Sequence, residues 1–283
     1  MTDFADNVAA FDERARGGAE GDCLRVLQIT DTHLYADPRG RLGGLTTERS
    51  YFEVMEKVLR EHWPVDLVLA TGDIVHDGSA AAYRRFKSQF EDLAVRTLVI
   101  PGNHDAPDTM RQVMEGGRVT WSGSAILGRW QFVMLDTVVP GATGGHLREE
   151  QLALLRRCLS DHRNFHAIIC LHHHPVAMGS DWLDRIGIDN AEALWRVIDE
   201  FPQVRAVVWG HVHQDWRGVR GDVDLFASPS TCIQFKPGQK TFTVDEAPPG
   251  YRWFRLHGDG RLETGVERLN GVPETLDIGC GGY

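Results

Sequence analysis

The sequence predicts an α/β (α+β) chain in which two mixed β-sheets pack face to face and helices cover their outer sides. Apolar, β-branched runs alternate with amphipathic segments over residues 23–213, as expected of strands joined by helices. After residue 215, short alternating segments with glycine turns favour antiparallel strands. Motifs rich in Asp, Asn and His directly follow most of the apolar runs, so the active site is expected in loops at the strand ends.

The first predicted strand covers 23–30 and leads into a glycine-rich loop or hairpin. Thr46 or Thr47 is a candidate N-cap for a helix over 47–62. Phe52, Met55 and Leu59 recur there at helical spacing, and this spacing predicts that their face packs inward.

Strands and helices then alternate along the chain. Strands are predicted over 65–71, 97–101, 125–127, 130–137, 166–171 and 205–209, and helices over 80–93, 108–116, 148–161 and 190–201. The run His257-Gly-Asp-Gly260 predicts a hairpin turn between two late strands.

The motifs span so much of the sequence that one domain over 23–275 is expected. Residues 1–22 are polar and glycine-punctuated, which predicts a flexible N-terminal segment, and 276–283 is expected to be a C-terminal tail. The acidic N-terminus lacks the apolar core of a signal peptide. No stretch approaches the roughly 18 apolar residues that a membrane span needs.

Charge and cysteine usage limit the partners and the compartment. The chain of 283 residues carries a formal net charge of −10 and shows no basic stretch, which argues against a nucleic acid polymer as partner. A small anionic substrate remains compatible with this charge. The five cysteines are scattered and form no C-x-x-C pair, so free thiols in the cytoplasm are expected.

Five short motifs carry the chemistry. They are Asp31-Thr-His33, Gly72-Asp73, Gly102-Asn103-His104-Asp105, His172-His173-His174-Pro175 and Gly210-His211-Val212-His213. Each alone has an ordinary structural explanation, such as a turn or a surface loop. Their conjunction after successive predicted strands indicates a site for two adjacent metal ions, because carboxylate, amide and imidazole groups suit first-row divalent metals.

Asp73 follows a strand and precedes a turn, which makes it the candidate bridge between the two ions. Two divalent ions with Asp31 and Asp73 leave a net charge near +2, which favours a phosphate ester as substrate. A metal-bound hydroxide would then serve as the nucleophile, since metals lower the pKa of bound water to roughly 7. His104, beside Asn103, is the candidate general acid, with Asp105 orienting it.

Other residues are assigned weaker roles. His76, three positions after Asp73, and His146 are secondary candidates for substrate contact, and Trp182 is expected to overhang the site. The remaining histidines outside the motifs are expected at the surface or in turns.

The five motifs, in this order, resemble the calcineurin-like metallophosphoesterase superfamily over nearly the whole chain. The segments 41–59, 172–194 and 231–262 further resemble the bacterial class III 3′,5′-cyclic AMP phosphodiesterases. This resemblance implies a four-layer metallophosphoesterase sandwich and a cap segment at about 176–190, with Asn190 on the substrate side.

The resemblance also implies the ligands. It assigns Asp31, His33 and His213 to one ion, Asn103, His173 and His211 to the other, and Asp73 to both. His173 is preferred to His172 and His174 because the family ligand stands two places before the proline. Fe²⁺ and Mn²⁺ are the implied metals, and Asn103, His104 and His213 are the implied contacts to the phosphate of AMP.

The implied reaction is hydrolysis of 3′,5′-cyclic AMP to AMP by a soluble monomer or homodimer that binds no membrane. The motifs also fit two alternatives. One is a broader phosphodiesterase acting on glycerophosphodiesters or 2′,3′-cyclic nucleotides, and the other is a non-enzymatic, metal-dependent binding module. A protein phosphatase is disfavoured, because the implied cap suits a small substrate.

Overall fold

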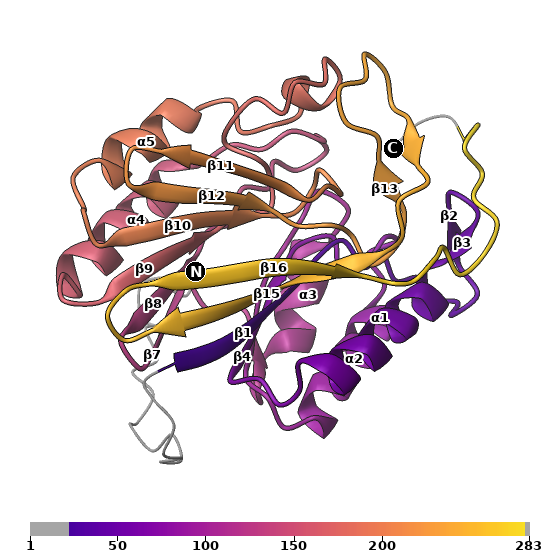
Figure 1. Cartoon of the computed structure of the whole chain (residues 1–283), viewed down its shortest axis with the longest axis horizontal. Helices are drawn as coiled ribbons and strands as arrows, with labels where there is room; N and C mark the ends of the chain where they lie inside the picture. The colour runs from indigo at the N-terminus through magenta and orange to yellow at the C-terminus, as the bar shows by residue number, and fades with distance from the viewer. Residues whose placement is uncertain (1–22, 281–283) are drawn as a thin grey trace.

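A computed structural model describes residues 23–280 and shows two six-stranded sheets packed face to face (Figure 1). The first sheet consists of β1 (Cys23–Ile29), β4 (Leu67–Thr71), β5 (Thr97–Ile100), β6 (Val119–Thr120), β15 (Gly250–His257) and β16 (Leu262–Arg268). The second consists of β7 (Ser124–Leu127), β8 (Trp130–Met134), β9 (His166–Cys170), β10 (Val204–Trp209), β11 (Trp216–Arg220) and β12 (Val223–Ala227). The predicted flexible segment 1–22, and 281–283 of the predicted tail, lie outside the described residues.

Both sheets are mixed, as predicted. The strand orders are β16-β15-β1-β4-β5-β6 and β11-β12-β10-β9-β8-β7. In the first sheet β1, β4 and β5 run parallel, and in the second β8, β9, β10 and β12 run parallel. The late strands add antiparallel hairpins, including β15–β16 with its turn at the predicted residues 257–260. Two small hairpins complete the list of strands: β2 (Arg41–Leu42) with β3 (Leu45–Thr46), and β13 (Gln234–Phe235) with β14 (Val244–Asp245).

Alternation along the strands produces three apolar layers. In β1, Val26 faces the second sheet, while Leu27 packs with the helices on the other side. Helices α1 (Thr47–Glu61), α2 (Ala80–Asp92) and α3 (Pro107–Met114) cover the first sheet, and α4 (Glu149–Asp161) and α5 (Ala191–Ile198) cover the second (Figure 1). Because each sheet buries both faces, its central strands are apolar throughout, as their sequences predict. The four-layer prediction is therefore confirmed.

The inward face of α1 differs from the prediction. Phe52 and Leu59 are 46% and 40% exposed, whereas Tyr51, Val54 and Val58 are buried. Of the predicted stripe only Met55 is buried. The buried set recurs at steps of three and four and places the apolar stripe about one residue away from the predicted one, because neighbouring residues on a helix differ by roughly 100° in direction.

Thr46 occupies the N-cap position of α1, but its side chain makes no capping bond. Its backbone N–H donates to Glu274 Oε2 at 2.6 Å, and its hydroxyl donates to Glu274 Oε1 at 3.2 Å. Asp277 N donates to Gly43 O at 3.0 Å. Residues 274–277 are thereby attached to the β2–β3 hairpin, next to the predicted boundary at 275.

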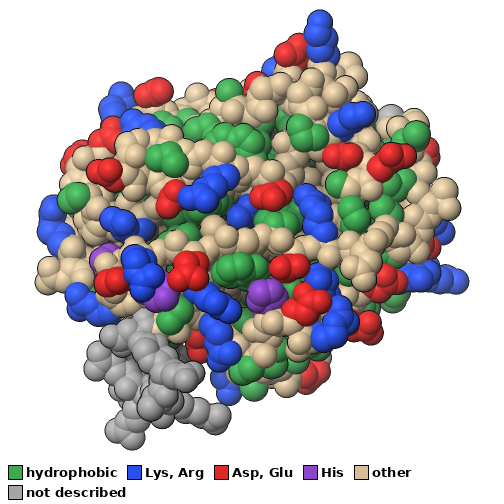
Figure 2. All heavy atoms as spheres, viewed as in Figure 1, with side chains coloured by type: hydrophobic (Ala, Val, Ile, Leu, Met, Phe, Trp, Pro, Cys, Tyr) green, Lys and Arg blue, Asp and Glu red, His purple; other side chains and the backbone are tan. Residues whose placement is uncertain are grey.

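The surface carries charges of both signs. On the face shown in Figure 2, Lys and Arg side chains alternate with Asp and Glu, without a broad basic field. This agrees with the negative net charge and offers no track for a phosphate backbone on that face. Within residues 23–280, no helix combines the length and apolarity needed to cross a bilayer.

Candidate metal centre

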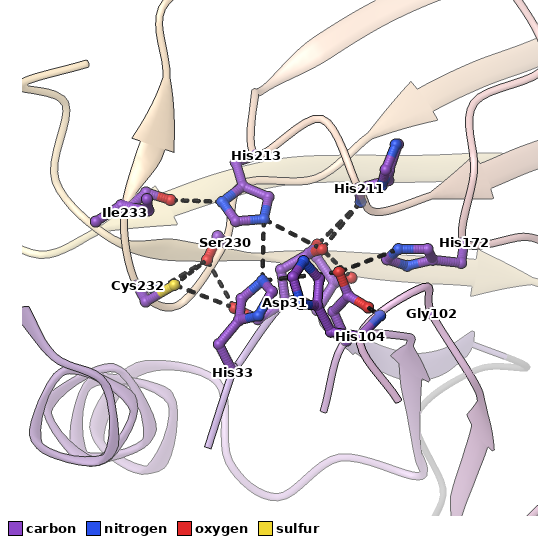
Figure 3. Close-up of polar contacts among 12 residues, drawn as sticks. Asp31, His33, Gly102, His104, His172, His211, His213, Ser230, Cys232 and Ile233 are labelled. Carbon is purple, nitrogen blue, oxygen red and sulfur yellow. Dashed lines mark hydrogen bonds and ion pairs between the residues drawn. The ribbon is translucent and has the colours of Figure 1, made fainter. Parts of the chain in front are cut away.

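The five motifs meet at one edge of the two sheets. Asp31 follows β1, Asp73 follows β4 and Asn103 follows β5, while His172 and His211 follow β9 and β10. These strands run parallel within each sheet, so their carboxyl ends lie together. Figure 3 shows side chains from both sheets pointing toward one another in this region.

The backbone at the site is strained. Among residues 23–280, six residues other than glycine have positive φ, and five of them belong to the motifs: Asp31, His33, Asp73, His211 and His213. A left-handed conformation costs of order 1–3 kcal/mol at such a residue and persists where surrounding contacts impose it. The strain is thus concentrated where the predicted metal ligands lie.

Hydrogen bonds impose this conformation. Asp31 N donates to Gly72 O at 3.0 Å, and His33 N donates to Asp73 O at 2.9 Å. The Asp31 carboxylate accepts from His211 N at 3.1 Å and from the Thr30 hydroxyl at 2.7 Å. The loops after β1, β4 and β10 are therefore tied to one another through the residues that carry the site.

The glycines of the motifs allow these close approaches. A Cβ added at Gly102 would lie 2.7 Å from Asp73 Cγ, and one at Gly210 would lie 2.7 Å from Asp31 Oδ2. Gly72 has φ +96°, and a Cβ there would lie 2.6 Å from His172 Cγ. Each glycine is needed where backbone packs directly on a site side chain.

One half of the site gathers Asp31, His33, His213 and Asp73, all of which are fully buried. His213 Nε2 lies 3.3 Å from Asp31 Oδ1 and 3.4 Å from His33 Nε2. His33 Nε2 lies 3.8 Å from Asp73 Oδ2. The ligand atoms of Asp31, His33 and Asp73 lie within 4.8 Å of one another, close enough to share one ion.

The other half gathers around His172. Its Nε2 lies 3.4 Å from Asp73 Oδ2 and 3.2 Å from Asn103 Oδ1, while its Nδ1 lies 2.8 Å from Thr71 O. Nitrogen atoms of His172, His173 and His211 lie within 4.8 Å of one another. His173 Nδ1 pairs with the Thr137 hydroxyl at 2.7 Å. It is thus His172, rather than His173, that directly faces Asp73 and Asn103.

The donor set fits divalent metal ions. In the part of the chain that the structure describes, both ring nitrogens of His211 and Nε2 of His173 are buried without a hydrogen-bond partner. A buried polar atom left in this way costs about 1–3 kcal/mol. Burial lowers the pKa of His33, His173 and His211 well below the usual value, which leaves the neutral imidazole that binds metals.

Asp73 is held ionised. Burial opposes its charge, but the neighbouring His172 and His33 outweigh that cost and hold the pKa of Asp73 well below its usual range. Burial likewise opposes protonation of His172, yet the Asp73 carboxylate raises the pKa of His172 to about 9. Positive charge beside the Asp73 carboxylate is therefore stabilised, and a cation bound there would be stabilised in the same way.

His104 lies at the rim of this cluster and is half-buried. Its backbone N–H donates to Asp73 Oδ1 at 2.8 Å, and its ring centroid lies 5.0 Å from that of His33. Burial lowers the pKa of His104. An anionic phosphate nearby would favour the protonated form that a general acid needs.

The prediction that Asp105 orients His104 is wrong. The Asp105 carboxylate points away and accepts from Gly102 N at 2.8 Å, Val75 N at 3.0 Å and the Tyr83 hydroxyl at 2.8 Å. Burial and the charge of Asp73 raise the pKa of Asp105 to about 6. Asp105 therefore ties the loop after β4 to the loop after β5.

Several neighbours of the site gave no distinct signal in the sequence. The ring of Phe235 stacks on His213 at 4.0 Å and 7°. Cys232 is buried, and its Sγ lies 3.5 Å from Asp31 O. His76 Nδ1 lies 3.1 Å from His33 Nδ1. Of these three residues, only His76 had a signal in the sequence, namely its position three residues after Asp73. Phe235 and Cys232 lie far along the chain from any motif, so the motifs did not point to them.

The predicted cap segment contacts the histidine motif, since Ile188 N donates to His174 O at 3.0 Å. The Asn190 side chain accepts from Leu147 N at 2.9 Å and donates to Leu147 O at 2.8 Å, while His146 Nδ1 lies 2.6 Å from Asp189 Oδ1. Trp182 packs on the rings of Phe235 and Phe242. Trp182 thus lies one layer behind Phe235, against the prediction that it overhangs the site directly.

The chain is similar to proteins of known activity. Residues 24–215 match the family model described as calcineurin-like phosphoesterase. The 3′,5′-cyclic adenosine monophosphate phosphodiesterase CpdA of Pseudomonas aeruginosa is 43% identical over 258 residues, covering 91% of this chain and 94% of that protein. CpdA of Escherichia coli K12 is 39% identical, covering 92% and 95%.

Solved structures share the fold at low identity. A dimetal phosphatase from Danio rerio has a TM-score of 0.57 at 18% identity, covering 87% of this chain and 98% of that chain. The purple acid phosphatase PPD1 of yellow lupin has a TM-score of 0.62 at 15% identity, covering 88% and 52%.

Proposed function

Because the chain belongs to the calcineurin-like phosphoesterase family, we propose that it hydrolyses 3′,5′-cyclic AMP to AMP at a two-metal centre. The observation that carries this proposal is the convergence of Asp31, His33, Asp73, Asn103 and the histidines of two later motifs at one sheet edge. The similarity to CpdA proteins over more than nine-tenths of the chain supports the substrate.

The ligand sets follow the two halves of the site. Asp31, His33 and His213 would hold one ion and Asp73 would be shared with the second, as the family resemblance implies. Asn103 and His211 would hold the second ion. For its remaining ligand, the distances from Nε2 to Asp73 and Asn103 favour His172 over the predicted His173.

The histidine assignment has a direct test. His172→Ala is expected to lose one ion of two, and His173→Ala to retain more of that ion, measured as metal content by mass spectrometry after gel filtration. The reverse result would restore the His173 assignment. His174→Ala is the matched control from the same motif.

Two divalent ions, when bound at this centre, would supply positive charge for the phosphate and make hydroxide available near neutral pH. Attack of that hydroxide on phosphorus would form one P–O bond and break the bond to the 3′ oxygen. His104 gives its proton to that leaving oxygen, and Asn103, His104 and His213 contact the phosphate. The product AMP keeps its phosphate on the 5′ oxygen.

His104 is the catalytic group most open to a clean test. His104→Ala is expected to bind both ions but to lower kcat about 10²–10⁴-fold, the usual contribution of a general acid. Loss of metal in this variant, or unchanged turnover, would remove His104 from this role.

The substrate is tested with the purified protein loaded with Mn²⁺ or Fe²⁺, the two metals proposed for the centre. Turnover of 3′,5′-cyclic AMP that disappears in Asp73→Ala supports the proposal. Strong turnover of an aryl phosphodiester, a glycerophosphodiester or a 2′,3′-cyclic nucleotide, with little on cyclic AMP, would favour the broader phosphodiesterase instead. Metal binding without turnover of any diester would favour a binding module.

The remaining assignments belong to the same proposal. The enzyme is a single domain over 23–275, with residues 176–190 as a cap, and acts in the cytoplasm as a monomer or homodimer. The five cysteines are free, which suits a reducing compartment. Sedimentation of the full chain measures its oligomeric state.

A further inference from the structure

We propose that His76 is a positioning residue for His33. It accepts a hydrogen bond from Nδ1–H of His33 and so holds Nε2 of His33 toward Asp73 and His213. This inference rests on the proposed function, because it takes His33 to be a metal ligand.

The backbone brings the two histidines together. The loops after β1 and β4 run side by side as a parallel pair beyond the ends of their strands. Asp31 N, His33 N and Leu34 N donate in turn to carbonyls of residues 72, 73 and 74, and His76 N donates back to Leu34 O at 2.8 Å. The strained φ of His33, 45°, is fixed within this pairing. The separation of 3.1 Å between the two Nδ1 atoms is thus set by both loops.

The tautomers follow from the two sides of the His33 ring. Its Nε2 faces Asp73 Oδ2 at 3.8 Å and His213 Nε2 at 3.4 Å, where a metal ligand must offer a lone pair. A neutral imidazole carries one N–H, so the hydrogen of His33 resides on Nδ1. Nδ1 of His76 is then the acceptor, and the hydrogen of His76 resides on its Nε2. Such outer bonds fix both the tautomer and the ring orientation of a ligand histidine.

Two aromatic neighbours hold His76 itself. Its ring stacks on His104 with centroids 4.5 Å apart and 19° between planes, and it packs on Tyr35 at 4.7 Å. His76 is half-buried, so it is ordered without being sealed inside the core. It therefore joins the ligand His33 to the proposed general acid His104.

The test compares metal affinities of the two sites. Metal-free wild type, His76→Ala and His76→Gln are titrated with Mn²⁺ and followed by calorimetry and by the electron paramagnetic resonance signal of free Mn²⁺. His76→Ala is expected to lower the affinity for the ion held by His33 about 10–100-fold and to leave the affinity for the other ion unchanged. Gln offers an acceptor oxygen, so His76→Gln is expected to regain most of that affinity.

The matched control is His62→Ala. His62 is also half-buried and stacks on an aromatic ring, that of Trp253, but it lies at the end of α1 away from the motifs. Both ions are expected to bind this variant as tightly as wild type. A second readout is the ¹⁵N spectrum of histidine in the Zn²⁺-loaded protein, where His33 is expected to carry hydrogen on Nδ1 in wild type.

Three results overturn the inference. The first is that His76→Ala binds both ions as tightly as the wild type does. The second is that His76→Ala loses affinity for both ions to the same extent. The third is a third ion in wild type that His76→Ala alone removes, since nitrogens of His33, His76 and His104 lie within 4.8 Å of one another and would then form a metal site. If the wild-type chain binds no divalent ion, the proposed function fails together with the inference. In the three results above, the wild type still binds metal, so only the role of His76 fails.

Discussion

At the scale of single residues, the site depends on side chains that hold loops as much as on those that face the substrate. Asp105 shows this clearly, because it belongs to the Gly102–Asp105 motif but points away from the metal ligands. Its carboxylate accepts three backbone N–H groups and one phenol, from loops that also carry Asp73 and Asn103. A motif residue therefore serves the chemistry by fixing where its neighbours lie.

This role predicts a large loss of stability for Asp105→Ala. Removal of the carboxylate leaves buried N–H groups unsatisfied, each at about 1–3 kcal/mol, so we expect the free energy of unfolding to fall by roughly 3 kcal/mol or more. Urea denaturation of the metal-free protein measures it. Tyr83→Phe removes one partner and is expected to cost roughly 1 kcal/mol. Asp108→Ala, which changes an exposed carboxylate three positions further along in the first turn of α3, is the control. An equal loss there would contradict the argument.

At the scale of elements, the strand ends and their glycines decide the geometry. A motif glycine has a neighbour that the sequence does not reveal: Gly102 packs on Asp73, which lies 29 positions earlier in the chain, and Gly210 packs on Asp31. These contacts cross between loops, and for Gly210 they cross between the two sheets. A larger residue at either glycine would therefore displace a site side chain that belongs to another loop.

Gly102→Ala tests this dependence. The added Cβ would meet the buried Asp73 carboxylate and would also lie 2.5 Å from the Asp73 backbone nitrogen, so the backbone as well as the side chain would have to shift. We expect weaker binding of both ions, since Asp73 is the proposed bridge, and a melting temperature several degrees below that of wild type. Gly271→Ala is the matched control, because nothing lies within 4 Å of its added Cβ. Two tightly bound ions in Gly102→Ala would show that the loop can adjust.

In helix α1, the surrounding structure determines which face of the helix is buried. Its sequence contains apolar residues on more than one face, so periodicity alone allowed the stripe through Phe52, Met55 and Leu59. The sheet beneath it selects the stripe through Tyr51, Val54, Met55 and Val58. The choice follows from the direction in which the helix lies on β1 and β4, which the helical sequence does not encode by itself.

At the scale of the whole molecule, the site concentrates buried neutral histidines, and this couples stability to pH. Burial lowers the pKa of His174 to about 4 and that of His33, His173 and His211 well below the usual 6.5. At these four histidines the unfolded chain therefore binds more protons than the folded chain below pH about 6.5, and their number outweighs Asp105, whose raised pKa acts in the opposite direction. Their contribution to stability is present above that pH and is lost as pH falls toward 4.

We expect the metal-free protein to lose unfolding free energy steeply between pH 6.5 and 4. One histidine whose pKa moves from 6.5 to about 4 contributes up to roughly 3 kcal/mol over that interval. Denaturant titrations at pH 7, 6, 5 and 4 measure the slope. His174→Asn is expected to have a shallower slope than wild type, and a stability that stays flat down to pH 4 would contradict the assignment of neutral histidines.

The sequence by itself determined the alternation of strands and helices, the two mixed sheets, and the motifs that gather at the strand ends. It did so because strand burial, helical spacing and motif position are local patterns of residue type. The order of the five motifs also identified the family.

Only the tertiary structure decided which neighbours complete the site. His172 rather than His173 faces Asp73 and Asn103, Asp105 binds loop amides rather than His104, and Trp182 packs behind Phe235. His76 contacts His33 across 43 positions of sequence. These relations depend on the exact direction of side chains from separate loops, and that direction is fixed by packing and hydrogen bonds between elements that are distant in the sequence.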